Sequence, residues 1–296
     1  MWKGSLVAIA TPFDGRNRVD HEAMRRLLDF HLEQGSDGIV VAGTTGESAT
    51  LEKSEHVELV MRVAEYVDGR MTVLAGTGSN STQQTIDLSL AVGSSRIDGY
   101  LLVAPYYNKP VQAGIFQHFT AIADAVDKPV MLYNVPGRTI TDILPETLAR
   151  LAEHPNIVAL KDATGDLQRL ADQQAVVRGD FLYFSGDDFT ALDFLLAGGH
   201  GVVTVSGNVA PASMAALCAL AASGDTAGAR VIDDSLQPLN KALFVESNPI
   251  PVKWALQQMG LITGGIRLPL TSHAAEYHEQ MRAALNTAGI KLSGNQ

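Results

Sequence analysis

A lysine at the end of a short apolar run is the residue of this sequence best suited to covalent chemistry. Lys161 follows residues 157–160 (Ile-Val-Ala-Leu) and precedes residues 162–165 (Asp-Ala-Thr-Gly). Such a run predicts a buried strand, with Lys161 where the strand leaves the core. Burial penalises the ammonium and lowers the pKa of a lysine from about 10.4 toward neutrality. An uncharged lysine amine forms Schiff bases with carbonyl substrates; the alternative is a lysine that extends into solvent.

The turn after the strand-like run 38–42 combines two glycines with two hydroxyls. Residues 43–47 read Gly-Thr-Thr-Gly-Glu. Glycine lets the backbone approach a ligand, and the hydroxyls and amides of Thr44 and Thr45 can hold a carboxylate. The alternative is a turn that only caps the following helix.

A phenol and a guanidinium follow the strand-like run 130–133. Residues 133–139 read Tyr-Asn-Val-Pro-Gly-Arg-Thr. Because consecutive strands are usually neighbours, Tyr133 and Arg138 are predicted beside Lys161. A Schiff base needs a group that moves protons to and from the carbinolamine, and a buried phenol can do this. The arginine suits a carboxylate through its bidentate guanidinium.

Two pairs at other strand ends have open interpretations. Tyr106 and Tyr107 are adjacent phenols that must point in different directions, and such pairs are often plain packing. Asp187 and Asp188 follow the run 181–184 and are as well suited to capping the next helix as to contacting substrate.

Strand-like runs alternate with helical periodicity, which predicts an α/β fold with a (β/α)8 TIM barrel. A doubly wound sheet is the alternative, but no Gly-x-Gly-x-x-Gly motif opens a helix after the first strand. The strands are expected at 6–10, 38–42, 72–75, 100–103, 130–133, 157–160, 181–184 and 201–205. Helices are expected at 20–34, 54–67, 82–92, 114–126, 145–153, 189–197 and 210–222.

The chain beyond residues 223 and 224 (Ser-Gly) has only helical patterns. They cover 227–243, 251–259 and 274–288. The predicted organisation is therefore a catalytic barrel over 1–223 and a C-terminal helical region over 224–296.

Composition excludes several classes of function. The 296 residues suit two average domains or one α/β barrel. A net charge of −10 without any basic cluster argues against nucleic acid or an anionic membrane as partner. The single cysteine, Cys218, excludes an internal disulfide and fits a reducing compartment. The first residues lack a charged leader and no apolar stretch approaches about 20 residues, so the expected location is cytoplasmic.

Other catalytic classes lack their motifs. The eight histidines show no metal-binding spacing, so no metal site is predicted. No cofactor motif is present, and no Gly-x-Ser-x-Gly supports serine hydrolysis. The glycines at 198–201 precede the eighth strand, on the wrong face of a barrel for phosphate binding.

The chain resembles the pyruvate-dependent class I aldolase family over nearly its whole length, from Gly4 to Leu270. The resemblance depends on three elements in order: the turn 43–47, a Tyr-Asn-x-Pro element at 133–136, and Lys161, 28 positions after Tyr133. It implies that Lys161 binds pyruvate as an imine and that Tyr133 donates and accepts the proton. It further implies a relay of Thr44, Tyr133 and Tyr107, the last from a neighbouring subunit, and pyruvate contacts from Thr45, Gly186 and Val203.

Within this family, the double threonine and Arg138 favour the branch that condenses pyruvate with L-aspartate 4-semialdehyde in lysine (diaminopimelate) biosynthesis. Arg138 would hold the carboxylate of the semialdehyde. The alternatives are N-acetylneuraminate lyase, a 2-keto-3-deoxy-sugar-acid aldolase, and a barrel that binds keto acids without turnover. The resemblance implies a homotetramer built from tight dimers, and the lack of a cofactor motif predicts that no cofactor is needed.

Many members of this family bind L-lysine at a dimer interface. Gln84 stands where sensitive enzymes usually carry an acidic residue, and Lys53 stands where a histidine is common. Both changes weaken binding of a cationic ligand, which predicts weak or absent inhibition. The matching positions are Ser48, Ala49, Lys53, His56, Asn80, Gln84 and Tyr106.

Overall fold

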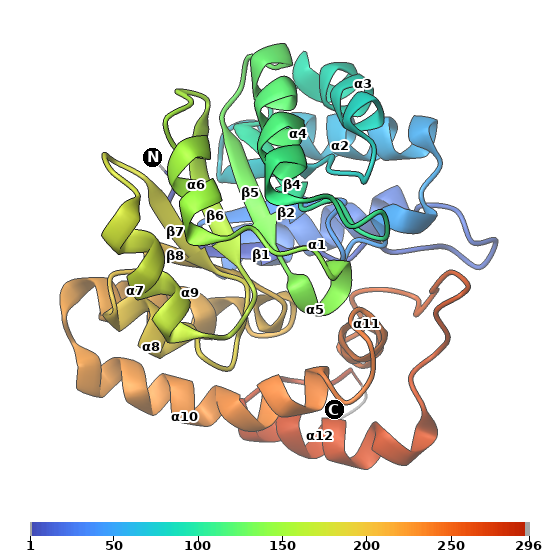
Figure 1. The fold of residues 1–296 in the computed structure, drawn as a ribbon. Helices are drawn as coiled ribbons and strands as arrows, with labels where there is room; N and C mark the ends of the chain where they lie inside the picture. The colour runs from blue at the N-terminus through green and yellow to red at the C-terminus, as the bar shows by residue number, and fades with distance from the viewer. Residues whose placement is uncertain (1, 294–296) are drawn as a thin grey trace.

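Eight parallel strands close into a barrel in the order of the sequence in the computed structural model, which describes residues 2–293 (Figure 1). The predicted (β/α)8 barrel is therefore confirmed. The strands are β1 (Gly4–Ala8), β2 (Gly38–Val41), β3 (Thr72–Gly76), β4 (Gly99–Val103), β5 (Val130–Asn134), β6 (Ile157–Asp162), β7 (Leu182–Ser185) and β8 (Gly201–Thr204).

Helices between the strands cover the outside of the barrel (Figure 1). Their ends agree with the predicted ranges to within about two residues for most helices. The covering helices are α1 (His21–Glu33), α2 (Lys53–Val67), α3 (Thr82–Gly93), α4 (Gln112–Ala125), α6 (Pro145–Leu151), α7 (Leu167–Val176), α8 (Ala191–Leu196) and α9 (Pro211–Ser223). A short helix, α5 (Pro136–Thr139), is inserted after β5.

Helix α7 has no counterpart among the predicted helices. Only Leu170 and Gln173 of its ten residues are buried, and residues 167–176 contain few large apolar side chains to mark a buried helix face. The local signal is its N-cap, because the Asp166 carboxylate accepts from the backbone N–H of Gln168 at 2.9 Å.

The barrel has two separate apolar cores. One lies between the strands and the covering helices. The other fills the barrel interior and takes alternate residues from each strand, such as Met131 and Tyr133 of β5. Ala159 of β6 belongs to the same interior, and the register sets Tyr133 beside Lys161. Alternation along a strand thus directs both side chains into the barrel.

Three C-terminal helices gather on one side of the barrel (Figure 1). The loop before α11 contacts α5 through Asn248 and Arg138, and α10 packs against α9 and α12. These helices are α10 (Thr226–Leu243), α11 (Ile250–Gln258) and α12 (His278–Thr287). The division into a barrel over 1–223 and a helical region over 224–296 stays a prediction. No helix between residues 2 and 293 is long and apolar enough to span a membrane.

Candidate active site

Lys161 lies in the barrel interior with only 5 % of its surface exposed. Its Nζ is 4.0 Å from the centroid of the Tyr133 ring. Burial lowers the pKa of Lys161 to about 7; the negative charge of Asp188 opposes this shift, and the positive charge of Arg138 adds to it. An appreciable fraction of the lysine is therefore the free amine near neutral pH.

Strand β6 continues two residues beyond its predicted end. Lys161 pairs with Phe184 of β7, and the ladder ends with Asp162. Lys161 is thus a strand residue whose backbone is held on both sides. The extension arises because strand pairing continues through polar residues, where an apolar pattern no longer marks the strand.

The phenol of Tyr133 is also buried. Burial raises its pKa, while the charge of Arg138 and a side-chain hydrogen bond with Thr44 act in the opposite direction. The raised pKa keeps the phenol protonated near neutrality. Tyr133 can therefore give a proton to a group bound at Lys161 and take one back.

Gly186 and Val203 border the space around Lys161 and the barrel interior. A Cβ at position 186 would lie 2.7 Å from Lys161 Cε and 2.8 Å from Ala163 Cβ, so a side chain there would displace the lysine. Val203 is buried on the inward face of β8. Glycine at position 186 thus leaves room for the extended lysine side chain.

The turn after β2 is held by residues of the C-terminal region. Thr45 is buried and its Oγ1 accepts from Asn248 Nδ2 at 2.9 Å. Glu47 adopts a left-handed backbone conformation with φ of 54°. Its carboxylate pairs with the buried Lys253 and also accepts from the backbone N–H of Arg267 at 3.0 Å. The C-terminal region therefore fixes the geometry of this turn.

Arg138 lies on α5, where its Nη2 donates to the backbone oxygen of Asn248 at 3.3 Å. Its positive charge lowers the pKa of both Lys161 and Tyr133. The pKa of Lys161 responds to Arg138, and the pKa of Tyr133 responds to Arg138 and Thr44, so these four residues influence one another electrostatically.

Tyr107 points away from this group. Its side chain is 88 % exposed and its backbone has φ of 74°, a left-handed conformation. Tyr133 and Thr45, in contrast, are buried. The phenol of Tyr107 therefore does not pack with Thr44 and Tyr133 of its own chain.

A cavity of about 700 Å³ opens beside the site. Thr44, Val135, Arg138 and Asn248 line one part of it. Six of the seven positions of the predicted lysine site line it as well: Ser48, Ala49, Lys53, His56, Gln84 and Tyr106.

The remaining position of the predicted lysine site, Asn80, donates from Nδ2 to the backbone oxygen of Tyr106 at 3.2 Å.

His56 Nε2 lies 2.9 Å from the Gly76 oxygen, and burial lowers the pKa of His56. His56 is thus neutral near pH 7 and adds no positive charge beside Lys53.

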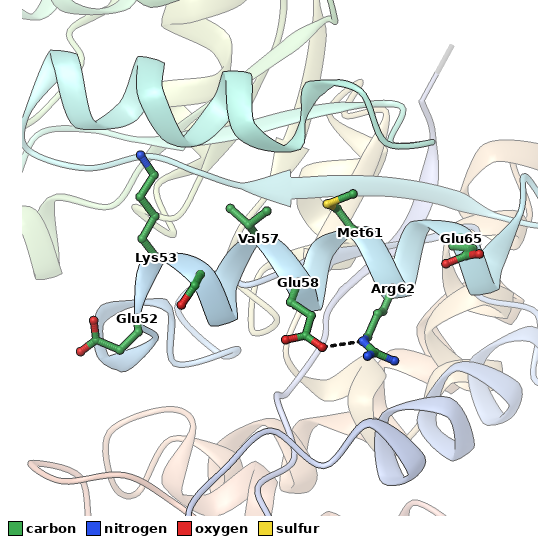
Figure 2. A pocket seen from close by; sticks show the side chains of 8 residues that line it. Glu52, Lys53, Val57, Glu58, Met61, Arg62 and Glu65 are labelled. Carbon is green, nitrogen blue, oxygen red and sulfur yellow. Dashed lines mark hydrogen bonds and ion pairs between the residues drawn. The ribbon is translucent and has the colours of Figure 1, made fainter.

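A larger hollow of about 1010 Å³ runs along the outer face of α2 (Figure 2). Apart from the half-buried Val57, its lining side chains are exposed, and Arg62 Nε donates to Glu58 Oε1 at 2.8 Å. It contains no residue from a strand end. We therefore assign the chemistry to the barrel site.

The two aspartates after β7 have structural roles. Asp187 Oδ2 accepts from the backbone N–H of Thr190 at 3.1 Å and so caps the turn before α8. Asp188 is buried, and its Oδ2 accepts from the backbone N–H groups of Val205 and Ser206, both at 2.8 Å. Asp188 thereby joins the ends of β7 and β8.

Two residues that shape the site, Asn248 and Lys253, were not among the predicted ones, and both come from the C-terminal region. Asp188 was recognised at its strand end, but the sequence left its role open. Among residues 2–293, no group of three or more His, Cys, Asp and Glu side chains could hold a metal ion.

The sequence and the fold of this chain are similar to those of one family of known proteins. The sequence matches the dihydrodipicolinate synthetase family over residues 1–288. It is 54 % identical over 290 residues to the 4-hydroxy-tetrahydrodipicolinate synthase of Pseudomonas aeruginosa, which covers 98 % of this chain and 99 % of that protein.

Two solved structures are similar over nearly the whole chain. One is the chloride-inhibited dihydrodipicolinate synthase from Acinetobacter baumannii complexed with pyruvate, with a TM-score of 0.96, 47 % identity, and coverage of 98 % of this chain and 99 % of that one. The other is the enzyme from Cyanidioschyzon merolae with lysine bound, with a TM-score of 0.94, 43 % identity and coverage of 98 % and 99 %.

Proposed function

Because the chain belongs to the dihydrodipicolinate synthetase family, we propose that it is a lyase that condenses pyruvate with L-aspartate 4-semialdehyde. The product is 4-hydroxy-tetrahydrodipicolinate, an intermediate of lysine biosynthesis through diaminopimelate. The observation that carries the proposal is the buried amine of Lys161, whose pKa is about 7 and which lies 4.0 Å from the Tyr133 ring centroid.

The reaction begins when the free amine of Lys161 attacks the ketone carbon of pyruvate. The carbinolamine loses its hydroxyl as water, with a proton from Tyr133, and an imine remains. Removal of a proton from the methyl group gives an enamine, whose carbon attacks the aldehyde of the second substrate. The amine of that substrate then adds to the imine carbon, closes the ring and releases Lys161.

The other site residues bind the substrates or move protons. Thr45, Gly186 and Val203 contact pyruvate, and the hydroxyl of Thr45 donates to its carboxylate. Arg138 holds the carboxylate of the semialdehyde through a bidentate pair. The Thr44 hydroxyl acts on the Tyr133 phenol and lowers its pKa, and this proximity supports the first part of a proton relay.

Tyr107 completes this relay in a neighbouring subunit, within a cytoplasmic homotetramer of tight dimers. Its 88 % exposure in the single chain supports a role outside that chain. Mixed dimers of Lys161→Ala and Tyr107→Phe chains test the assignment. Activity should return to roughly one site per mixed dimer, and no recovery after verified subunit exchange would contradict it.

Borohydride reduction in the presence of pyruvate tests the chemistry directly. We expect the mass of one reduced pyruvate per chain, located on Lys161 by peptide mapping. Turnover is then measured with pyruvate and L-aspartate 4-semialdehyde. Reduction at another lysine, or none, would contradict the mechanism, and trapping without turnover of the semialdehyde would contradict the assigned second substrate.

A further inference from the structure

Asn248 is buried and contacts the turn after β2 with its side chain and helix α5 with its backbone. Its Nδ2 donates to Thr45 Oγ1 at 2.9 Å, and its backbone oxygen accepts from Arg138 Nη2 at 3.3 Å. Asn248 and Thr45 are both buried, so water competes little for their hydrogen bond. One residue of the C-terminal region thus contacts both residues that are proposed to bind the two substrate carboxylates.

The direction of this hydrogen bond decides what the Thr45 hydroxyl can offer to a ligand. A hydroxyl has one proton and two lone pairs. Asn248 occupies a lone pair of Thr45 Oγ1, which leaves the proton for another acceptor. Within residues 2–293 no side chain or backbone oxygen accepts that proton. Thr45 is therefore a free donor.

The oxygen of the same amide is also without a partner. Asn248 Oδ1 is buried and makes no hydrogen bond within the described part of the chain. If the side-chain amide of Asn248 were rotated so that Oδ1 and Nδ2 exchanged places, Oδ1 would accept the Thr45 proton. That proton would then be unavailable to a ligand. The observed orientation leaves both the proton and Oδ1 unpaired, and such buried groups cost free energy. A ligand that accepts the Thr45 proton removes part of that cost.

The position of Asn248 is fixed by the helix that follows it. Asn248 lies two residues before α11, and the backbone N–H of Ile250 donates to the Ser247 oxygen at 2.9 Å. Lys253 of α11 pairs with Glu47, two residues after Thr45. The amide of Asn248 and the hydroxyl of Thr45 are thus held by one connected set of contacts.

We propose that Asn248 is a positioning residue for pyruvate, whose amide orients the Thr45 hydroxyl as a donor to the pyruvate carboxylate. This inference rests on the proposed function, in which Thr45 binds that carboxylate. In this role Asn248 acts on pyruvate through Thr45. It acts by deciding which hydrogen-bonding face Thr45 presents.

Two substitutions separate this role from simple packing. Asn248→Asp keeps the shape, but a carboxylate only accepts hydrogen bonds, so it takes the Thr45 proton and adds a negative charge near the substrate carboxylate. Asn248→Ala removes the amide and leaves the Thr45 hydroxyl free to rotate. We expect the KM for pyruvate to rise roughly 30-fold or more in the aspartate variant and about three- to tenfold in the alanine variant. Turnover at saturating pyruvate should change much less than KM in both.

A packing role predicts the opposite order, because aspartate fills the space that alanine leaves empty. Comparable or better pyruvate binding by Asn248→Asp than by Asn248→Ala would therefore overturn the proposal. Circular dichroism and the midpoint of thermal unfolding verify that each variant is folded.

The matched control is the same pair of substitutions in a Thr45→Val background. Without the hydroxyl, Asn248→Ala should not raise the KM for pyruvate further. The same fold-increase in both backgrounds would overturn the proposal, and this comparison remains decisive if the aspartate variant does not fold. Borohydride trapping on the unmodified protein is run in parallel: absence of a pyruvate adduct on Lys161 would contradict the proposed function, whereas a normal adduct with the wrong order of variants would contradict only the role of Asn248.

Discussion

Two buried lysines in this molecule have similar surroundings and different partners. Lys161 of β6 is 5 % exposed and Lys253 of α11 is 2 % exposed. Each ammonium faces an aromatic ring, Tyr133 at 4.0 Å and Phe13 at 4.2 Å. Burial lowers the pKa of Lys161 to about 7 and that of Lys253 to about 8. Among residues 2–293, only Lys253 of the two has a carboxylate in direct contact, that of Glu47.

The two lysines differ in whether the amine is held by an ion pair in the folded protein. Lys253 is engaged in an ion pair that links the C-terminal region to the turn after β2. Lys161 feels the charge of Asp188 only through space, since that carboxylate is bound to backbone N–H groups of Val205 and Ser206. A buried lysine without a partner retains a free amine for chemistry, whereas a paired one supports the structure.

The largest effect is expected from removal of the unpaired lysine. Lys161→Met should reduce turnover about 10⁴-fold or more, because it removes the amine that is proposed to form the imine. Its stability near pH 7 should not fall: the folded pKa lies below the unfolded one, so the unfolded state binds more protons and the native lysine opposes folding there. Turnover and urea unfolding measure the two quantities. Substantial residual activity would place the nucleophile elsewhere.

Removal of the paired lysine, Lys253, should lower stability and leave the chemistry at Lys161 intact. Lys253→Met leaves the carboxylate of Glu47 buried without its partner and should lower the free energy of unfolding by about 3–5 kcal/mol. Urea denaturation measures this loss, and the double variant Lys253→Met/Glu47→Leu should recover much of it. Pyruvate trapping on Lys161 should persist wherever the variant is folded. Unchanged stability of the single variant would contradict the structural role of the pair.

Removal of the arginine tests whether the free lysine depends on its neighbour. Arg138→Ala should reduce turnover with the semialdehyde about 10- to 100-fold, since charge-assisted hydrogen bonds to a carboxylate are lost. Pyruvate trapping should continue, and the pKa of Lys161 should rise because the charge of Arg138 lowers it in the native protein. Loss of trapping would instead show that Arg138 organises the whole site. Arg138→Lys, which keeps charge without the bidentate geometry, is the matched control.

The pH dependence of trapping measures the unpaired amine itself. With the pKa of Lys161 at about 7, the free-amine fraction should increase roughly tenfold between pH 6 and pH 8 and then level off. The initial rate of adduct formation, followed by mass spectrometry after rapid reduction, should follow this curve. A rate that continues to rise toward pH 10 would indicate an ordinary lysine.

The smallest effect is expected from L-lysine as an inhibitor. Gln84 offers a bound L-lysine only a neutral amide. Compared with a site that has a carboxylate at this position, the ligand loses a charge-assisted hydrogen bond worth about 1.5–3 kcal/mol, and Lys53 adds a positive charge nearby. Titration of activity with L-lysine at subsaturating pyruvate should therefore show weak or no inhibition. The variant Gln84→Glu should increase it. Strong inhibition of the unmodified protein at low lysine concentration would show that nearby acidic residues compensate.

The sequence predicted well those features that depend on local pattern. Strands of a barrel are buried on both faces, so their apolar runs stand out, and polar residues at their ends are then brought to one face. The approach of Tyr133 to Lys161 follows directly from the pairing of β5 and β6. Helix α7 was missed because only two of its residues are buried.

The contacts made by the C-terminal region could not be predicted in this way. Asn248 and Thr45 are separated by 203 positions, and Lys253 and Glu47 by 206. Asn248 lies in the loop before α11, and Lys253 interrupts an apolar run in which every residue from Ile250 to Leu256 is buried. Neither local pattern identifies the partner of the polar side chain. Their roles depend on contacts with residues far away in the sequence, which are a property of tertiary packing.

Because Lys253 is synthesised long after Glu47, the pairing of these two residues can form only late in translation. The barrel strands and every proposed catalytic residue emerge before residue 224, and N-terminal segments begin to fold first during synthesis. The partners of Thr45, Glu47 and Arg138 lie at residues 248–267 and emerge last. A nascent chain that already contains Lys161 therefore still lacks the contacts that shape its binding turn, and the enzyme acquires its finished site only near the end of translation.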